Sequence, residues 1–237
     1  MNTPDPVQAQ SHEYYARNAD LYAKVIYDFY DDVYTDISHP GFTNDRDLIR
    51  MVQSLVPKGA RGLDAGCGAG ARDVFSYYQA GYDISGVDAV AENIAVAKRE
   101  HPEITDRVAV SDLTAPLNFA DNYFDFVTCN TVIQHINPDL VMQHVLPEFT
   151  RVLKKGGILQ LMFKSGQGTL QHYDDLFKAD RTFYLYDPDE LLAALQPQGF
   201  VLIEEQLDIE NAPLLGGMVY FTDPRSIRNC AFWVQKI

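Results

Sequence analysis

The chain has 237 residues, of which 46% are hydrophobic and 22% charged, so it is long and apolar enough for one domain with a sizeable core. Its 33 acidic and 19 basic residues leave a formal charge of −14, which disfavours nucleic acid and anionic membranes, because such partners need clustered Lys and Arg. Three widely spaced cysteines without a CxxC pair exclude a disulfide scaffold and a zinc knuckle.

The first residues and the hydropathy pattern indicate a protein that stays in the cytoplasm. Residues 1–11 are polar and predict a flexible tail without the basic and apolar segments of a signal peptide. No apolar run approaches the ~20 residues that span a bilayer. We therefore expect a cytoplasmic monomer or homodimer that binds neither membrane nor nucleic acid.

Two helical stretches precede the first expected strand and form a helical cap over residues 12–56. The first runs from Ser11 to Tyr34, in one or two pieces, and is rich in tyrosine. The second runs from Asp45 to Leu55 and carries an apolar stripe at helical spacing.

From residue 60 onward, short apolar runs alternate with helical segments. The expected strands cover residues 61–65, 83–87, 107–110, 124–129, 158–163, 200–207 and 230–234, and the expected helices cover 71–80, 91–100, 138–153 and 189–195. This alternation predicts an α/β fold, a mostly parallel sheet with helices on both faces. The predicted domain spans residues 12–237, with a cofactor-binding core at 60–163, a lid-like insertion at 164–187 and a C-terminal helix and strands at 188–237.

A glycine-rich loop follows the first expected strand and opens a helix. Residues 64–70 are Asp-Ala-Gly-Cys-Gly-Ala-Gly, so the glycines have the spacing G-x-G-x-G, whereas the dinucleotide fingerprint is G-x-G-x-x-G. Asp64 is a poor neighbour for a pyrophosphate and a good neighbour for an ammonium group. The spacing therefore argues against an oxidoreductase that uses a nicotinamide cofactor.

Acidic residues also follow the next two expected strands. Asp88 comes 24 residues after Asp64, close to the spacing of about 20 residues that is typical of a ribose-binding acid, and Asp112 follows the third strand. Because ligands of doubly wound sheets bind at the carboxyl ends of the strands, we expect the three acids to share one site.

Together, residues 63–70, Asp88 and Asp112 resemble the cofactor motifs of class I S-adenosylmethionine-dependent methyltransferases of the small-molecule type. The resemblance covers residues 14–163 by motif and 187–237 by architecture. It implies a Rossmann-like sheet of seven strands in which only the last is antiparallel. It also implies S-adenosylmethionine as cofactor and S-adenosylhomocysteine as product. No metal is expected, because the fourth strand does not end in an acid.

The resemblance assigns roles to individual residues. Asp88 would bind the ribose and Asp112 the adenine amino group, and tyrosines of the N-terminal segment would close over the methionine moiety. His135 is the candidate catalytic base, although packing in the core is an equally weighted alternative for it and for each tyrosine. The expected cofactor contacts are Tyr14, Tyr15, Tyr22, Asp64, Ala65, Gly66, Gly68, Asp88, Ala89, Asp112, Leu113, Asn130 and Gln134.

The expected function is transfer of a methyl group from S-adenosylmethionine to O, N or C of a small-molecule acceptor by in-line displacement. The alternatives are a non-catalytic S-adenosylmethionine-binding scaffold or sensor, and a protein- or RNA-modifying methyltransferase, whose RNA form the acidic composition disfavours. The negative charge favours a neutral or cationic acceptor over an anionic one. The candidate acceptor contacts are His172, Tyr173, Arg181, Tyr184, Tyr186, Arg225 and Arg228.

Overall fold

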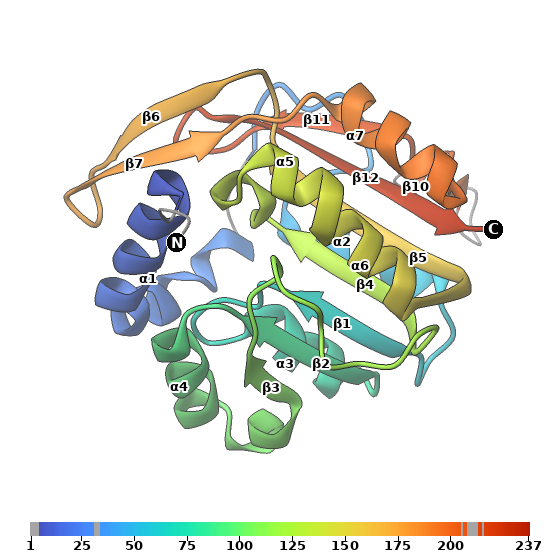
Figure 1. Cartoon of the computed structure of the whole chain (residues 1–237), viewed down its shortest axis with the longest axis horizontal. Coiled ribbons are helices and arrows are strands. Elements are labelled where there is room, and N and C mark those ends of the chain that lie inside the picture. The colour runs from blue at the N-terminus through green and yellow to red at the C-terminus, as the bar shows by residue number, and fades with distance from the viewer. Residues whose placement is uncertain (1–4, 31–33, 205, 208–212, 215) are drawn as a thin grey trace.

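The computed structural model describes residues 5–30, 34–204, 206–207, 213–214 and 216–237 (Figure 1). These residues form an eight-stranded sheet of order β11-β12-β5-β4-β1-β2-β3, in which β8 also pairs with β12. Strands β1 to β5 are parallel, and β12 runs antiparallel to β5, which confirms the predicted mostly parallel α/β sheet. The strands are β1 Arg61–Ala65, β2 Asp83–Asp88, β3 Val108–Val110, β4 Phe124–Asn130, β5 Leu153–Lys164, β8 Phe200–Leu202, β11 Met218–Thr222 and β12 Arg228–Lys236.

The eighth strand is β11, which lies between the expected strands 200–207 and 230–234, where no strand was expected. Strand β11 pairs with the first half of β12, and β8 pairs with its last three residues along the same edge. The expected strand 200–207 ends at Leu202, and Gln206–Leu207 (β9) pairs instead with Pro213–Leu214 (β10). Burial explains the extra strand, because the Phe221 ring packs 4.7 Å from the ring of Phe42 in the helical cap.

Helices cover both faces of the sheet, as expected. One face carries the core that includes Val52 and Tyr77, and the other carries the core that includes Phe149 and Leu191. The helices are α1 Pro6–Val25, α2 Asp45–Leu55, α3 Arg72–Gln79, α4 Ala91–Glu100, α5 Pro138–Leu140, α6 Leu146–Val152 and α7 Pro188–Leu195. Among the described helices, none is both long and apolar enough to cross a bilayer.

The expected single helix over 138–153 contains a π-helical turn, Val141–Val145, between α5 and α6. In this turn the amide of Leu146 donates to the carbonyl of Val141, five residues back. The next residue is Pro147, which lacks an N–H and crowds the carbonyl four residues before it, so the regular ladder is interrupted here.

Helix α1 begins earlier than expected, at Pro6. Residues 6–11, which the sequence analysis assigned to a flexible tail, are therefore helical, and residues 1–4 of that tail lie outside the described residues. The carboxylate of Asp5 caps the helix by accepting from the amides of Val7 and Gln8, both at 3.0 Å, and Pro6 occupies the first helical position. The cap was missed because the first turn carries few apolar residues.

The lid-like insertion contains a β-hairpin formed by β6 (Thr169–Asp174) and β7 (Ala179–Tyr184), which pair antiparallel and form a sheet of their own. Figure 1 shows the hairpin beside α1, above the main sheet. The amide of Thr182 donates to Oε1 of Gln10 at 2.8 Å, and the Tyr184 hydroxyl donates to Asp5 at 2.8 Å. These bonds join the hairpin to α1.

Candidate active site

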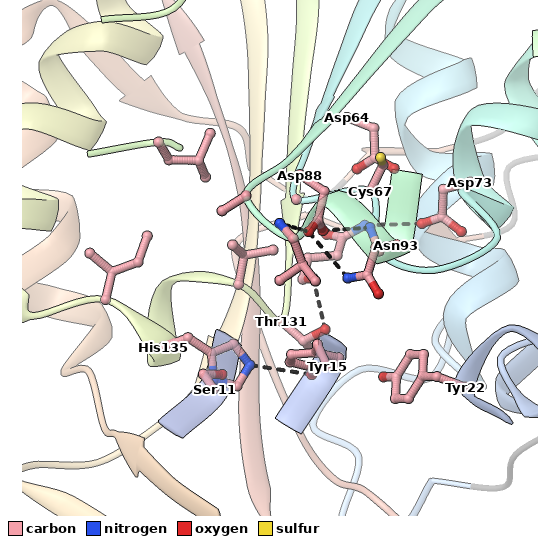
Figure 2. Close-up of a pocket in the computed structure, with 18 of the residues that line it drawn as sticks. Ser11, Tyr15, Tyr22, Asp64, Cys67, Asp73, Asp88, Asn93, Thr131 and His135 are labelled. Atoms are coloured by element: carbon pink, nitrogen blue, oxygen red, sulfur yellow. Dashed lines mark hydrogen bonds between the residues drawn. The ribbon is translucent and has the colours of Figure 1, made fainter. Parts of the chain in front are cut away.

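A pocket opens at the carboxyl ends of β1, β2 and β4, and α1 closes it from the other side. Figure 2 shows Ser11 and Tyr15 of α1 opposite Asp64 and Asp88 of the sheet. The parallel arrangement brings these distant segments together, because all the carboxyl ends lie at one edge. The predicted site residues that line the pocket are Tyr15, Tyr22, Asp64, Gly66, Gly68, Asp88, Ala89, Asp112, Leu113, Asn130 and His135.

The glycine loop passes tightly under the pocket. At Gly66, φ is +92°, and an added Cβ would lie 2.3 Å from Cγ2 of Val132, so only glycine fits. At Gly68, φ is +65°, but no atom lies within 4 Å of the position of a Cβ. The backbone at Gly68 therefore faces open space in the pocket and allows a ligand to approach closely.

Asp88 ties the glycine loop to the end of β2. Its Oδ2 accepts from the amide of Gly68 at 2.9 Å, and its Oδ1 accepts from the amide of Val90 at 2.8 Å and from Nδ2 of Asn93 at 3.1 Å. Burial raises the pKa of Asp88, and these hydrogen bonds oppose the rise. Since a carboxylate has about four acceptor positions, roughly one remains for a ligand hydroxyl.

Asp112 lies in the loop after β3 and contacts both its own loop and α1. Its Oδ1 accepts from the amide and the hydroxyl of Thr114, each at 2.8 Å, and its Oδ2 accepts from Nε2 of Gln8 at 3.3 Å. Gln8 thus occupies the position where an adenine amino group was expected to donate. The amide side chain holds the first turn of α1 over this part of the pocket.

A cluster of buried charges fills the pocket floor, and most of it was missed in the sequence. Arg72 donates to Asp73 at 2.7 Å and to Asp45 at 3.0 Å. Burial, and then the charge of Asp73, raise the pKa of Asp64 well above its usual value. The floor therefore carries more carboxylates than cations. Arg72 and Asp73 were missed because they lie in the first turn of α3, where charged residues read as a solvated helix end.

A chain of hydrogen bonds holds Asn130 in the pocket wall. Nδ2 of Asn130 donates to Asp73 at 3.4 Å, and its Oδ1 accepts from Nε2 of Gln160 at 2.9 Å. Gln160 is fully buried and accepts in turn from the indole of Trp233 at 2.5 Å. Next to Asn130, Thr131 adopts φ +56°, a strained conformation for a β-branched residue at a ligand-binding edge.

His135 lies in the 3₁₀ turn Ile133–His135 and touches Tyr15 of α1. Its Nε2 lies 3.4 Å from the Tyr15 hydroxyl, and Nη2 of Arg181 donates to that hydroxyl at 2.8 Å. Because the hydroxyl oxygen accepts from Arg181, we assign its proton to the bond with Nε2 and the ring proton of His135 to Nδ1. Burial, and then the charges of Arg181 and Lys164, lower the pKa of His135 well below its usual value.

Three predicted contacts lie outside the pocket lining. The Tyr14 hydroxyl donates to Asp174 of the hairpin at 3.0 Å. Gln134 is buried, and its Nε2 donates to the carbonyl of Thr131 at 2.7 Å. Ala65 is fully buried at the end of β1. Each of the three lies next to a lining residue and supports it.

The residues named as candidate acceptor contacts divide into three groups. Tyr186 is buried, and its hydroxyl lies 2.7 Å from the carbonyl of Ile136, so it fixes the turn that carries His135. Tyr173 is half exposed, and Tyr173, His172, Tyr184 and Arg228 are not among the residues that line the pocket. Arg181 and Arg225 remain near the pocket, beside Tyr15 and Tyr22.

Comparisons with known proteins show what the chain is similar to in sequence and in fold. Residues 63–161 match the family model described as a methyltransferase domain. Phosphoethanolamine N-methyltransferase 2 of Caenorhabditis elegans is 30% identical over 175 residues, 72% of this chain and 39% of that protein. Demethylmenaquinone methyltransferase of Renibacterium salmoninarum is 37% identical over 129 residues, 54% of this chain and 51% of that protein. The chain thus spans about half the length of the curated relatives it matches, or less.

A solved methyltransferase structure matches the fold over nearly the whole chain. Geranyl diphosphate C-methyltransferase from Streptomyces coelicolor A3(2) superposes with a TM-score of 0.65 over 99% of this chain and 100% of that chain, at 15% identity. The matched segment 63–161 contains the glycine loop, Asp88 and Asp112, the residues that converge on the pocket. The chain is therefore similar to S-adenosylmethionine-dependent methyltransferases, in sequence over residues 63–161 and in fold over nearly its whole length.

Proposed function

We propose that this chain transfers a methyl group from S-adenosylmethionine to an O, N or C atom of a small-molecule acceptor. One observation carries the proposal: the glycine loop, Asp64, Asp88 and Asp112 converge on a single pocket that α1 closes. The relatives named above, which act on different small molecules by their names, support the reaction and leave the acceptor open.

The residues of the pocket fit this cofactor. The lining includes a single arginine, Arg72, against five aspartates, which favours a ligand with an ammonium and a sulfonium over a phosphate. Gly68 leaves room for the ligand against the backbone. Oδ1 of Asn93 is buried without a hydrogen-bond partner among the described residues, so a donor from the ligand would satisfy it. The five aspartates are Asp45, Asp64, Asp73, Asp88 and Asp112.

We assign the adenosine end of the pocket to β2 and β3. Asp88 has about one acceptor position left, which suits one ribose hydroxyl, and binding of both hydroxyls requires it to release Asn93 or Val90. Asp112 would accept from the adenine amino group after Gln8 has moved aside, with Ala89 and Leu113 on the faces of the ring. Binding is therefore coupled to the position of the first turn of α1.

When bound, S-adenosylmethionine supplies an electrophilic methyl group on a good leaving group, so the protein mainly has to orient the acceptor and exclude water. Tyr15 and Tyr22 of α1 cover the side of the pocket next to Asn130 and His135. Their rings are 5.3 Å apart and pack edge to face, which makes this wall apolar apart from the hydroxyls.

His135 lines the same side of the pocket as Tyr15 and Asn130, where we expect the acceptor. Its Nε2 faces Tyr15, and its Nδ1 has no hydrogen-bond partner among the residues that the structure describes. Because its pKa is lowered, the ring is neutral and a weak base. We propose that Nδ1–H orients the acceptor by a hydrogen bond. The base predicted from the sequence stays a prediction that a pH profile tests.

The three cysteines support a reducing, cytoplasmic setting for this reaction. Cys67, Cys129 and Cys230 are all free and buried. We propose a monomer or homodimer that acts on a diffusible acceptor without nucleic acid or membrane.

Calorimetric titration with S-adenosylmethionine and S-adenosylhomocysteine tests the proposal. We expect saturable binding of both in the micromolar range, followed by release of S-adenosylhomocysteine when small acceptors are added. If neither ligand binds, the cofactor assignment and the proposed function are wrong. Binding of both without turnover of any acceptor favours the scaffold or sensor alternative.

A further inference from the structure

Two cations are almost fully buried beside the pocket. Lys164, at the end of β5, has 3% of its side chain exposed, and Arg181, in β7, has 5% exposed. Nζ of Lys164 lies 4.8 Å from the centroid of the Phe183 ring, and Cζ of Arg181 lies 4.7 Å from the same centroid. Phe183 also packs against His135, at 5.5 Å between ring centroids. The side chain of Phe183 therefore lies between the two positive groups and His135, which lines the pocket.

Neither cation has a carboxylate at hydrogen-bonding distance within the described part of the chain. Nζ of Lys164 lies 3.6 Å from Oδ2 of Asp223, and Nη1 of Arg181 lies 3.7 Å from Oδ2 of Asp174. The hydrogen bond that Arg181 does make is to the neutral hydroxyl of Tyr15. A buried cation is costly unless it is paired and hydrogen-bonded, so these longer ion pairs, with the ring contacts of both cations, compensate each charge only in part.

The two carboxylates are also committed to other donors. Oδ1 of Asp223 accepts from two backbone amides of its own turn at 3.0 Å, and its Oδ2 lies 3.3 Å from Nη2 of Arg225. Oδ1 of Asp174 accepts from two amides of the hairpin turn, and its Oδ2 accepts from Tyr14. Among the described residues, Lys164, Arg181 and Arg225 thus contact two carboxylates that also hold turns in place.

The local field is positive, in a chain whose total charge is negative. Burial, followed by the charge of Arg225, lowers the pKa of Lys164 to about 7, and Asp223 only partly opposes this. Arg225 and Arg181 thus disfavour the protonated form of Lys164, whereas neighbouring groups raise the pKa of both arginines. An anion placed beside Lys164 would favour its protonated form.

The positive cluster begins where the pocket ends. Met162 lines the pocket, and Lys164, two residues further along β5, points to the same side of the sheet. Tyr15 lines the pocket as well, and its hydroxyl accepts from Arg181. An acceptor that extends from the cofactor along this wall therefore approaches both cations.

We propose that the methyl acceptor is an anion whose carboxylate or phosphate group is held at this end of the pocket by Lys164 and Arg181. The inference rests on the proposed function and names its substrate class. Lysine and arginine donors suit both kinds of oxyanion. This proposal reverses the expectation of a neutral or cationic acceptor, which was drawn from the net charge of the chain. The charges next to the binding site act on the acceptor more strongly than the net charge of the whole protein.

The test uses the full chain saturated with S-adenosylhomocysteine and three probes that share a phenyl ring. Benzoate and phenyl phosphate are the anions, and benzamide is the neutral counterpart of benzoate. In calorimetric titrations at constant ionic strength, we expect at least one anion to have a Kd at least tenfold lower than that of benzamide. The better anion distinguishes carboxylate from phosphate. If neither anion has this advantage, the proposal is wrong.

Variants show whether the preference comes from the buried cations. We expect Lys164→Met and Arg181→Met each to reduce the preference for the anion to below threefold, and Arg181→Lys, which keeps the charge, to retain part of it. Lys178→Met, at the exposed turn of the same hairpin, is the matched control and should keep all of it. If both methionine variants keep the preference for the anion, the two cations have a purely structural role and the proposal is wrong.

Affinity for S-adenosylhomocysteine separates the two proposals. An unchanged Kd in a variant shows that it is folded and that its cofactor site is intact. If one methionine variant does not fold, Lys164→Gln or Arg181→Gln replaces it. If the wild-type chain itself fails to bind S-adenosylhomocysteine, the proposed function fails, and the titrations with benzoate and benzamide on the free protein still report on the cation cluster.

Discussion

The amide of Gly68 donates to the carboxylate of Asp88 at 2.9 Å, so the loop after β1 and the acid at the end of β2 form one unit. The loop depends on Asp88 for its shape, and Asp88 depends on the loop for its orientation. Any ligand that binds the free acceptor position of Asp88 is therefore also placed against the backbone of Gly68.

Replacing Asp88 by Ala should weaken cofactor binding and loosen the loop. A hydrogen bond to a charged group contributes about 1.5–3 kcal/mol, so we expect the Kd of S-adenosylmethionine to rise roughly tenfold or more. The melting temperature should also fall, because the amides of Gly68 and Val90 lose their acceptor. Calorimetry and thermal unfolding measure the two effects, with Asp106→Ala on the surface as control. An unchanged Kd would remove Asp88 from the cofactor site.

The two glycines of the loop should respond differently to an added methyl group. In Gly66→Ala the new Cβ meets Val132 at 2.3 Å, so strain and overpacking should lower the free energy of unfolding by about 2–5 kcal/mol. In Gly68→Ala only the strain of a positive φ remains, about 1–2 kcal/mol, but the Cβ enters the ligand space.

Urea unfolding and cofactor titration separate these effects. Gly66→Ala should lose mainly stability, whereas Gly68→Ala should remain folded and bind S-adenosylhomocysteine at least tenfold more weakly. Equal affinity of Gly68→Ala and the wild type would show that no ligand approaches this backbone.

The parallel core and the acidic strand ends could be predicted from the sequence because both depend on local patterns. Apolar runs of strand length alternate with helical periodicity, and each of the acids Asp64, Asp88 and Asp112 lies at or just after such a run. Parallel topology alone then brings them to one edge. Strand β11 was not predictable in this way, since its pairing with β12 and its packing against Phe42 connect segments far apart in the chain.

The missed site residues share a physical cause. Asp73 and Lys164 are charged residues at the end of an element, where a charge usually points to solvent. In this chain, helical segments and the hairpin cover those ends, so the same residues are buried. Burial by a segment that is distant in the chain cannot be predicted from the local sequence.

Replacing His135 by Ala should lower kcat about tenfold without creating or removing a pH dependence. The loss of one orienting hydrogen bond of about 1–1.5 kcal/mol accounts for a change of this size. Because burial lowers the pKa of His135 well below 6.5, the ring stays neutral between pH 6 and 9 in the wild type. Rate measurements over this range, with His172→Ala as control, check the prediction. An inflection that disappears in His135→Ala would show a base with an ordinary pKa.

Lys164 should make the stability of the protein rise with pH between about 7 and 10. Its folded pKa is about 7, whereas a lysine in an unfolded chain has a pKa near 10.4. Between these values the unfolded chain binds a proton that the folded chain does not. The cost of Lys164 is therefore fully present below pH 7 and decreases as the pH approaches the unfolded value, by up to about 1.4 kcal/mol per pH unit.

The difference between wild type and Lys164→Met isolates this effect from the other titrating groups. We expect the free energy of unfolding of the wild type, minus that of the variant, to rise steadily from pH 7 to pH 10 in urea titrations, while Lys178→Met follows the wild type. Among the described residues, the charged groups that act most strongly on Lys164 are Arg225, Asp223 and Arg181, and of these three Asp223 favours the protonated amine. A bound anion adds a second such group, so saturating benzoate should reduce the slope if it binds beside Lys164. A flat difference without benzoate would mean that the buried amine is fully paired and that the positive field is absent.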